Sequence, residues 1–133
     1  MQDGVRNKFV FVSLWVPVFA WMAAIFFLSS RPITDYPQVV PDYVAHLVEY
    51  SLLAALLWRA LEAHVKGAGA LAGAVVLTTF SYGLTDEIHQ LFVATRTFSL
   101  FDLAVDTLAA VATVVAAVSS RLFFRRRRRA ALP

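Results

Sequence analysis

The sequence predicts an all-α, polytopic membrane protein, a bundle of four transmembrane helices with both termini in the cytoplasm. Hydrophobic residues make up 59% of the 133 residues and the mean hydropathy is +0.66, whereas a typical soluble domain has about 45–50% apolar residues. A domain of this size leaves much of its surface exposed, so a water-soluble globule could not bury this excess. Four long apolar runs joined by short polar segments account for it, and we expect one domain over residues 1–133.

The first apolar run covers residues 9–28 and contains no charged residue. About 20 residues cross a ~30 Å hydrocarbon core at ~1.5 Å per residue. A cleaved signal peptide is the alternative, because Arg6 and Lys8 precede the run. The run is longer than the ~7–15 residues of a signal core and no A-x-A cleavage site follows it, so a retained helix is favoured. Three prolines between residues 29 and 42 then predict a loop.

Three further runs follow, at residues 43–61, 68–93 and 99–122. The polar segment EAHVKGAG separates the first two of them, and the segment ATRTF separates the last two. The chain ends in a basic segment, residues 125–133. Connections this short favour antiparallel neighbours within one bundle.

The basic residues predict the orientation. With four spans, both termini and the second loop lie on the same side of the plasma membrane. That side holds ten of the twelve Lys and Arg residues, namely Arg6, Lys8, Arg59, Lys66, Arg121 and residues 125–129. The positive-inside rule therefore predicts cytoplasmic termini. The run of five Arg could instead be a nucleic-acid patch, but directly after a span a topology anchor that attracts anionic lipid is favoured. We therefore expect membrane lipids, and no nucleic acid, as partners.

Polar residues gather near the outer ends of the last three helices. They are Asp42, His46, Glu49 and Tyr50, then Asp86, Glu87, His89 and Gln90, and finally Arg96, Ser99, Asp102 and Asp106. Helical spacing puts most members of each set on one stripe, but Glu87 points about 100° away from Asp86. The deepest acids lie about seven residues, or ~10 Å, inside the outer ends of their runs. We therefore expect one outward-facing polar site, with Glu87 contacting a different partner, Arg96 or a second helix.

Burying so many acids in a bilayer is costly, at ~2.5–3.5 kcal/mol for each charged side chain at the midplane and less toward the interface. Five carboxylates lie beyond the interface, those of Glu49, Asp86, Glu87, Asp102 and Asp106. They cannot all be ionised there without cations, so we expect some to hold a proton or to bind a metal. Candidate ligands for a divalent metal are His46, Glu49, Asp86, His89 and Asp102, although no H-E-x-x-H spacing is present. The alternative is a hydrogen-bonded network that only fixes the register of the helices.

Three motifs resemble the VanZ-like family of membrane proteins. These motifs are D-x-x-x-H-x-x-E-Y at residues 42–50, D-E-x-H-Q-x-F at residues 86–92 and T-R-T-x-S-x-x-D-x-x-x-D at residues 95–106. Ser-Ser-x-Pro at residues 29–32 is also similar, and the resemblance covers about residues 9–118. Two positions depart from it, since Ala94-Thr95 stands where the family commonly has Pro-Gly and Ala109 where it tends to have Gly.

The resemblance implies a four-span, bacterial-type membrane protein. The founding member of the family is associated with resistance to glycopeptide antibiotics such as teicoplanin. The resemblance implies no particular reaction, so the chemistry must be argued from the residues.

One hypothesis is an enzyme that acts on an envelope lipid or a lipid-linked cell-wall component at the outer leaflet. Its candidate catalytic residues are His46, Glu49, Asp86, Glu87, His89, Asp102 and Asp106. Glu49 or Asp86 would be the general base, and a histidine, His46 or His89, the acid or proton carrier. Candidate substrate-binding residues are Asp42, Tyr50, Gln90, Arg96 and Ser99. Arg96 would hold a phosphate or carboxylate.

Two other classes of function stay open. A non-catalytic envelope protein would bind a lipid, a cell-wall precursor or a partner protein. A proton-coupled carrier would also need acids and His in the membrane, but the charges stop in the outer third of the helices. A covalent acyl mechanism is disfavoured, because no Ser or Cys nucleophile has an adjacent base.

Overall fold

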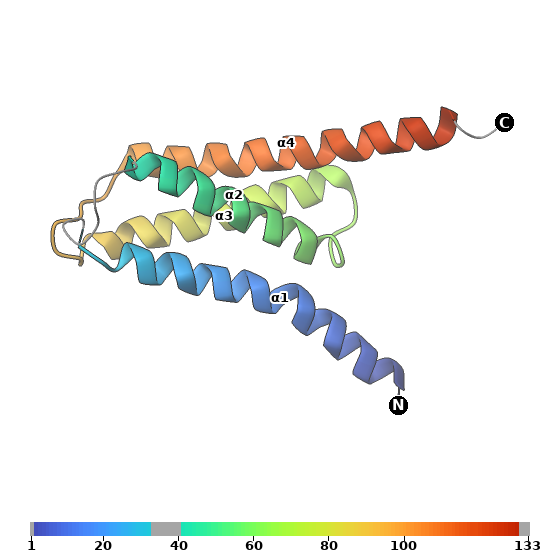
Figure 1. The fold of residues 1–133 in the computed structure, drawn as a ribbon, viewed down its shortest axis with the longest axis horizontal. Coiled ribbons are helices and arrows are strands. Elements are labelled where there is room, and N and C mark those ends of the chain that lie inside the picture. Colours follow the sequence, from blue (N-terminus) through green and yellow to red (C-terminus); the bar gives the residue numbers. More distant parts are fainter. Residues whose placement is uncertain (1, 33–40, 131–133) are drawn as a thin grey trace.

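The computed structural model describes residues 2–32 and 41–130, with side chains described for residues 9–32, 41–124 and 127. Its helices are α1 (Gln2–Ser29), α2 (Asp42–Leu61), α3 (Ala68–Gln90) and α4 (Leu100–Ala130) (Figure 1). Within the described ranges all regular secondary structure is helical. Four stretches are long and apolar enough to cross a membrane: Phe9–Ser29, Asp42–Leu61, Ala68–Gln90 and Leu100–Phe124. The predicted fold class, an all-α membrane protein with four spanning helices, is confirmed.

The two ends of the bundle differ in what they hold. α1 begins and α4 ends at one end, which also holds the α2–α3 connection (Figure 1). We call this the tail end. At the opposite end, which we call the site end, α1 and α3 finish and α2 and α4 begin. Both termini and the α2–α3 connection thus lie at the same end of the bundle, as the four-span topology predicts. The side of the membrane that each end faces stays a prediction of the positive-inside rule.

Local sequence explains where the helices begin and end. α2 starts directly after Pro41, with Asp42 in its first turn. A negative charge at this position interacts favourably with the helix dipole. α3 starts after Gly67, whose φ of +89° lies in the left-handed region that glycine adopts without strain. α3 ends at Gln90, three residues before the predicted end at residue 93, because the amides of residues 91–93 bond to carbonyls three residues back and form a turn.

α4 is longer than predicted, since it continues through the arginine run to Ala130. Arginine is a good helix former, so the basic segment extends the last span. The predicted loop between the first two helices falls largely on residues 33–40, which lie outside the described residues. The last residues of the tail, 131–133, and the side chains of Arg6, Lys8 and most of residues 125–129 also lie outside them.

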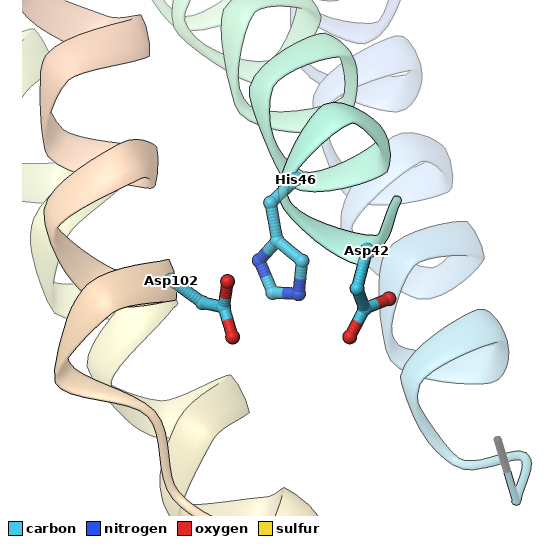
Figure 2. A group of neighbouring side chains, drawn as sticks. All are labelled: Asp42, His46 and Asp102. Carbon is cyan, nitrogen blue, oxygen red and sulfur yellow. The ribbon is translucent and has the colours of Figure 1, made fainter. Parts of the chain in front are cut away.

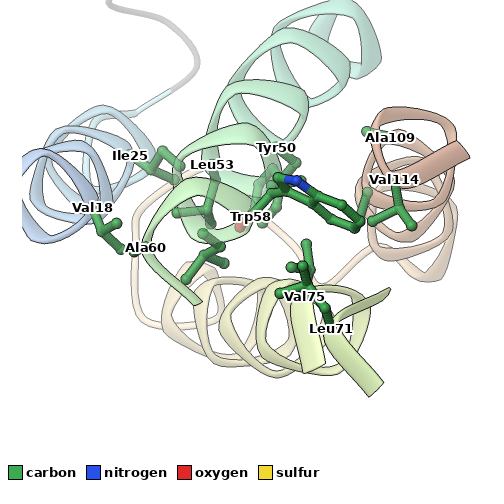
Figure 3. Close-up of a cluster of buried hydrophobic side chains, with 13 residues drawn as sticks. Val18, Ile25, Tyr50, Leu53, Trp58, Ala60, Leu71, Val75, Ala109 and Val114 are labelled. Carbon is green, nitrogen blue, oxygen red and sulfur yellow. The ribbon is translucent and has the colours of Figure 1, made fainter. Parts of the chain in front are cut away.

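α2 is central to the packing. It contacts each of the other three helices, whereas α1 lies at the edge, mainly against α2. The buried apolar cluster takes side chains from all four helices, among them Val18, Ile25, Leu53, Trp58, Val75 and Val114 (Figure 3). Ala109 and Ala110 of α4 are fully buried, and such small residues let helix backbones approach closely. This packing holds α2, α3 and α4 together and so fixes their polar faces at the site end.

Candidate functional site

A buried His–Asp pair joins α2 to α4 at the site end. His46 Nδ1 lies 3.0 Å from Asp106 Oδ1, and the two residues are 5% and 0% exposed. Because α2 and α4 both begin at the site end, positions one to two turns into each helix reach a similar depth. The structure thus brings these two predicted residues into contact.

Glu87 of α3 joins this pair from a third helix. It is 0% exposed, and its Oε2 accepts a hydrogen bond of 2.7 Å from the backbone amide of Ser99. His46, Glu87 and Asp106 each offer one ligand atom, and these three atoms lie within 4.8 Å of one another. We call these three residues the buried triad. Of the two predicted partners of Glu87, a second helix is right, whereas Arg96 is wrong because Glu87 faces the start of α4.

Some oxygens of this region have no hydrogen-bond partner among the described residues. They are Tyr50 Oη, Thr79 Oγ1, Glu87 Oε1 and Asp106 Oδ2, all buried. Buried polar atoms are usually paired, because leaving one unsatisfied costs about 1–3 kcal/mol. Two of these oxygens belong to the carboxylates of the buried triad, so the triad has unused capacity to bind a proton, water or a cation.

Gly83 of α3 provides the room that the triad needs. A Cβ at this position would lie 3.0 Å from Asp106 Oδ2 and 3.3 Å from Tyr50 Cε1. Tyr50 in turn lies parallel to the His46 ring, with an interplanar angle of 2° and 5.9 Å between ring centroids. A glycine therefore permits the close approach of α3 to the polar face of α2 and α4.

Asp42 and Asp102 form a second group around the same histidine. Their carboxylates lie on either side of the His46 ring (Figure 2), and one ligand atom from each of the three residues lies within 4.8 Å of the others. Asp42 is exposed and Asp102 is partly buried. We call Asp42, His46 and Asp102 the outer triad, because it connects the buried histidine to the surface of the site end.

Ser99 and Arg96, both predicted to bind substrate, have structural contacts here. Ser99 Oγ accepts a hydrogen bond of 3.1 Å from the Asp102 amide, the geometry of a helix N-cap. The Arg96 guanidinium donates to the Arg31 carbonyl oxygen at 3.1 Å and to Asp42 Oδ2 at 3.2 Å. The Arg96 side chain is only 7% exposed. Arg96 thus ties the α3–α4 connection to the end of α1 and the start of α2.

Asp86 faces a different helix from the buried triad. Its Oδ1 accepts a hydrogen bond of 2.5 Å from Ser29 Oγ at the end of α1, and its Oδ2 lies 3.4 Å from Gln90 Nε2. Asp86 and Gln90 are each 3% exposed. Among the described residues, the hydrogen bonds of Asp86 and Gln90 go to Ser29 of α1 and to each other, and not to His46.

His89 and Glu49 also lie outside the two triads. His89 Nε2 lies 3.0 Å from Ser30 Oγ, and its ring stacks on Phe26 with centroids 4.3 Å apart. Glu49 is partly buried, and its backbone carbonyl accepts a hydrogen bond of 2.9 Å from the Trp21 indole of α1. Among the described residues, the triads thus lie between α2, α3 and α4, whereas the hydrogen bonds of Asp86, His89 and the Glu49 carbonyl fasten the end of α1 to the bundle.

This division changes the expected metal ligands. Among the described residues, the groups of three or more closely spaced ligand atoms are the two triads. His46 and Asp102 of the predicted set belong to them, whereas Glu49, Asp86 and His89 do not. Glu87 and Asp106 take their places, because helix packing brings them, and not Asp86, to the histidine.

A family model described as VanZ/LLP1 matches residues 11–124, which include both triads and the contacts with α1. The chain belongs to the VanZ/LLP1 family. Neither a curated protein nor a solved structure matches the chain.

Two positions where the chain departs from the VanZ-like pattern have clear structural settings. Thr95, at the position where Gly is common, has a φ of 66°, in the left-handed region that disfavours a β-branched side chain. Ala109, at the position where Gly is also common, is completely buried in the core. The backbone is therefore strained locally at Thr95, whereas Ala109 fits into the core.

Three contributors were missed by sequence reasoning. Ser29 and Ser30 contact Asp86 and His89, and Gly83 makes room for the triad. The available signals were two successive hydroxyls at the end of the first span, and a lone glycine one turn before the acidic motif.

Proposed function

We propose that this VanZ/LLP1 protein acts on the head group of an envelope lipid or of a lipid-linked cell-wall component, with His46 and Asp106 as its acid–base pair. The observation that carries the proposal is the buried contact of His46 with Asp106, beside two carboxylate oxygens without hydrogen-bond partners among the described residues. Histidine is the side chain that most often transfers protons in enzymes. Glu49 and Asp86, favoured as bases from the sequence, lie outside this group, so the geometry favours His46.

The surroundings of the outer triad suit an amphiphile. Asp42 and Asp102 reach toward the surface of the site end, where a polar head group would meet them. Large apolar side chains beside them are exposed, namely Tyr43, Leu47, Leu100 and Phe101. The rings of Tyr43 and Phe101 lie 6.2 Å apart and connect α2 to α4. Acyl chains would lie along these side chains, while the head group would reach His46.

The predicted topology puts this chemistry at the outer leaflet. If the tail end, with most Lys and Arg, is cytoplasmic, then the site end faces outward. Lipid-linked precursors of the cell wall are used on that side of the plasma membrane. A change in their amount or structure would alter the susceptibility of a cell to glycopeptide antibiotics, the property associated with the founding member of the family.

A non-catalytic binding protein is the second candidate. It is supported by the number of polar contacts that only join helices, such as Ser29 with Asp86 and Tyr82 with the Met22 carbonyl oxygen. A proton-coupled carrier is less well supported, because the buried side chains that the structure describes nearer the tail end are apolar, including Leu57, Trp58 and Leu71.

Comparative analysis of envelope lipids and cell-wall components tests the proposal. The strains would lack the protein, or express the wild type, His46→Gln or His64→Gln at equal levels. His64 lies in the α2–α3 connection at the tail end, within 3.5 Å of Trp15 Nε1, so it is a matched control. We expect His46→Gln to reproduce the changes of the strain without the protein and His64→Gln to resemble the wild type.

Other outcomes separate the alternatives. Unchanged lipid and cell-wall species in the strain without the protein would refute the enzymatic proposal. If antibiotic susceptibility still changes in that strain, the binding role is supported. A shift of internal pH in proteoliposomes on addition of a solute would support the carrier.

A further inference from the structure

We propose that the buried triad of His46, Glu87 and Asp106 binds one divalent metal ion, such as Zn²⁺ or Mn²⁺. The inference rests on the proposed function and deepens it at the same site: with the ion bound, His46 and Asp106 would act as metal ligands in place of an acid–base pair. Imidazole nitrogen and carboxylate oxygen are established ligands of both ions. The three residues come from three different helices, and one ligand atom of each lies within 4.8 Å of the others.

The spacing between His46 and Asp106 suits a metal. His46 Nδ1 and Asp106 Oδ1 lie 3.0 Å apart. Two ligands bonded at ~2.1 Å would be ~3.0 Å apart at the right angles of an octahedral ion such as Mn²⁺, and ~3.4 Å apart at a tetrahedral Zn²⁺. An ion could therefore bind to this edge with little movement of the helices.

The unpaired oxygens provide independent support. Glu87 Oε1 and Asp106 Oδ2 have no hydrogen-bond partner among the described residues, although both residues are 0% exposed. An isolated buried carboxylate is strongly disfavoured unless it is paired or coordinates a metal. The other oxygen of each carboxylate is already used, by Ser99 and by His46 respectively. Each of the two carboxylates therefore has one oxygen still able to act as a ligand for a cation.

The charge balance points the same way. The buried triad contains two carboxylates, and the Arg side chains described at the site end contact other groups. Arg96 pairs with Asp42, and the Arg31 guanidinium lies over the Phe27 ring. A doubly charged ion would neutralise Glu87 and Asp106 together, and so remove the cost of burying two like charges side by side.

The buried triad is the better candidate of the two triads. In the outer triad, Asp42 is exposed and already contacts Arg96. A cation there would compete with the guanidinium for the carboxylate. In the buried triad all three residues are shielded from solvent, where the attraction between charges is stronger.

Metal content of the full-length protein, purified in detergent without chelator, tests the proposal. After incubation with Zn²⁺ or Mn²⁺ and removal of the excess, we expect about one ion per chain by mass spectrometry. Glu87→Gln and Asp106→Asn should each lower the metal content per chain at least about tenfold, because each removes a ligand. Glu62→Gln, at the surface of the tail end, and His64→Gln should retain the wild-type content.

A thermal measurement keeps the proposal testable if a variant folds poorly. The bound ion should raise the Tm of the wild type by several degrees over the chelator-treated protein, because it binds only the folded state. The proposal is overturned if the wild type holds no ion and shows no Tm shift with either metal, or if Glu87→Gln holds as much as the wild type. A failure here would leave the lipid analysis of the His46→Gln strain unaffected, so the two proposals fail separately.

Discussion

His46 Nδ1 of α2 and Asp106 Oδ1 of α4 lie 3.0 Å apart in a part of the bundle that is almost closed to solvent. Such a buried pair adds little net stability, because the cost of removing two polar groups from water offsets most of their attraction. The apolar core below it already joins the same helices. The pair is therefore better explained by chemistry than by packing.

Gly83→Ala should disturb the function more than the fold. Alanine stabilises a helix by ~1 kcal/mol over glycine, but its Cβ would contact Asp106 Oδ2 at 3.0 Å. We expect the two effects on Tm to cancel largely, while displacement of Asp106 removes the lipid change that the wild type causes. Gly73→Ala is the control, since nothing lies within 4 Å of its added Cβ. Wild-type lipid profiles for both variants would show that the space beside Asp106 is unimportant.

Arg96→Lys should destabilise the site end. Lysine cannot reproduce the two separate contacts of the guanidinium with the Arg31 carbonyl oxygen and Asp42. We expect the free energy of unfolding to fall by roughly 1–2 kcal/mol, measured by thermal unfolding in detergent. Arg31→Lys is the control, because it keeps the backbone carbonyl and, among the described residues, changes a cation–π contact with Phe27. Equal Tm values for the two variants would mean that Arg96 does not tie the connections together.

Ser29→Ala should loosen the attachment of α1. It removes the hydroxyl that donates to Asp86 Oδ1 and leaves a buried carboxylate oxygen without its donor. We expect the free energy of unfolding to fall by ~1–2 kcal/mol and proteolysis near α1 to become faster. Ser13→Ala on the same helix is the matched control, because the Ser13 hydroxyl bonds only within α1 in the described structure. A Tm for Ser29→Ala as high as that of Ser13→Ala would count against this role of Asp86.

Thr95→Gly should raise stability. Thr95 has a φ of 66°, where a β-branched residue is strained by ~1 kcal/mol or more and glycine is not. Thr95→Asn, which tolerates this region better and keeps a polar side chain, should also raise the Tm, whereas Thr95→Val should not. A Tm of Thr95→Val above the Tm of Thr95→Gly and of Thr95→Asn would show that the backbone at this position is unstrained in the protein.

The fold was predictable because the membrane limits the choices. The thickness of the hydrocarbon core sets the length of each apolar run, and the four runs correspond to the four helices. The ends were less predictable. α3 stops at Gln90 through turn hydrogen bonds, and α4 continues through the arginines, and neither effect is visible in hydropathy.

The site was predictable only in part. Helical spacing indicated that Asp86 and Glu87 point in different directions, and the structure agrees. Helical spacing does not predict which neighbouring helix each face contacts, because the periodicity of one helix does not determine the order of helices around the bundle. α1 covers the Asp86 face, so Glu87, and not Asp86, reaches His46.

We expect the buried triad to carry the function and not merely to fix helix register. Glu87→Gln separates these two roles, because glutamine keeps the volume and can still accept a hydrogen bond from the Ser99 amide, yet removes the carboxylate. The measurement is the envelope lipid profile of cells that express this variant at the wild-type level. We predict that the lipid profile of these cells matches that of cells without the protein. A profile identical to that of the wild type would contradict the claim.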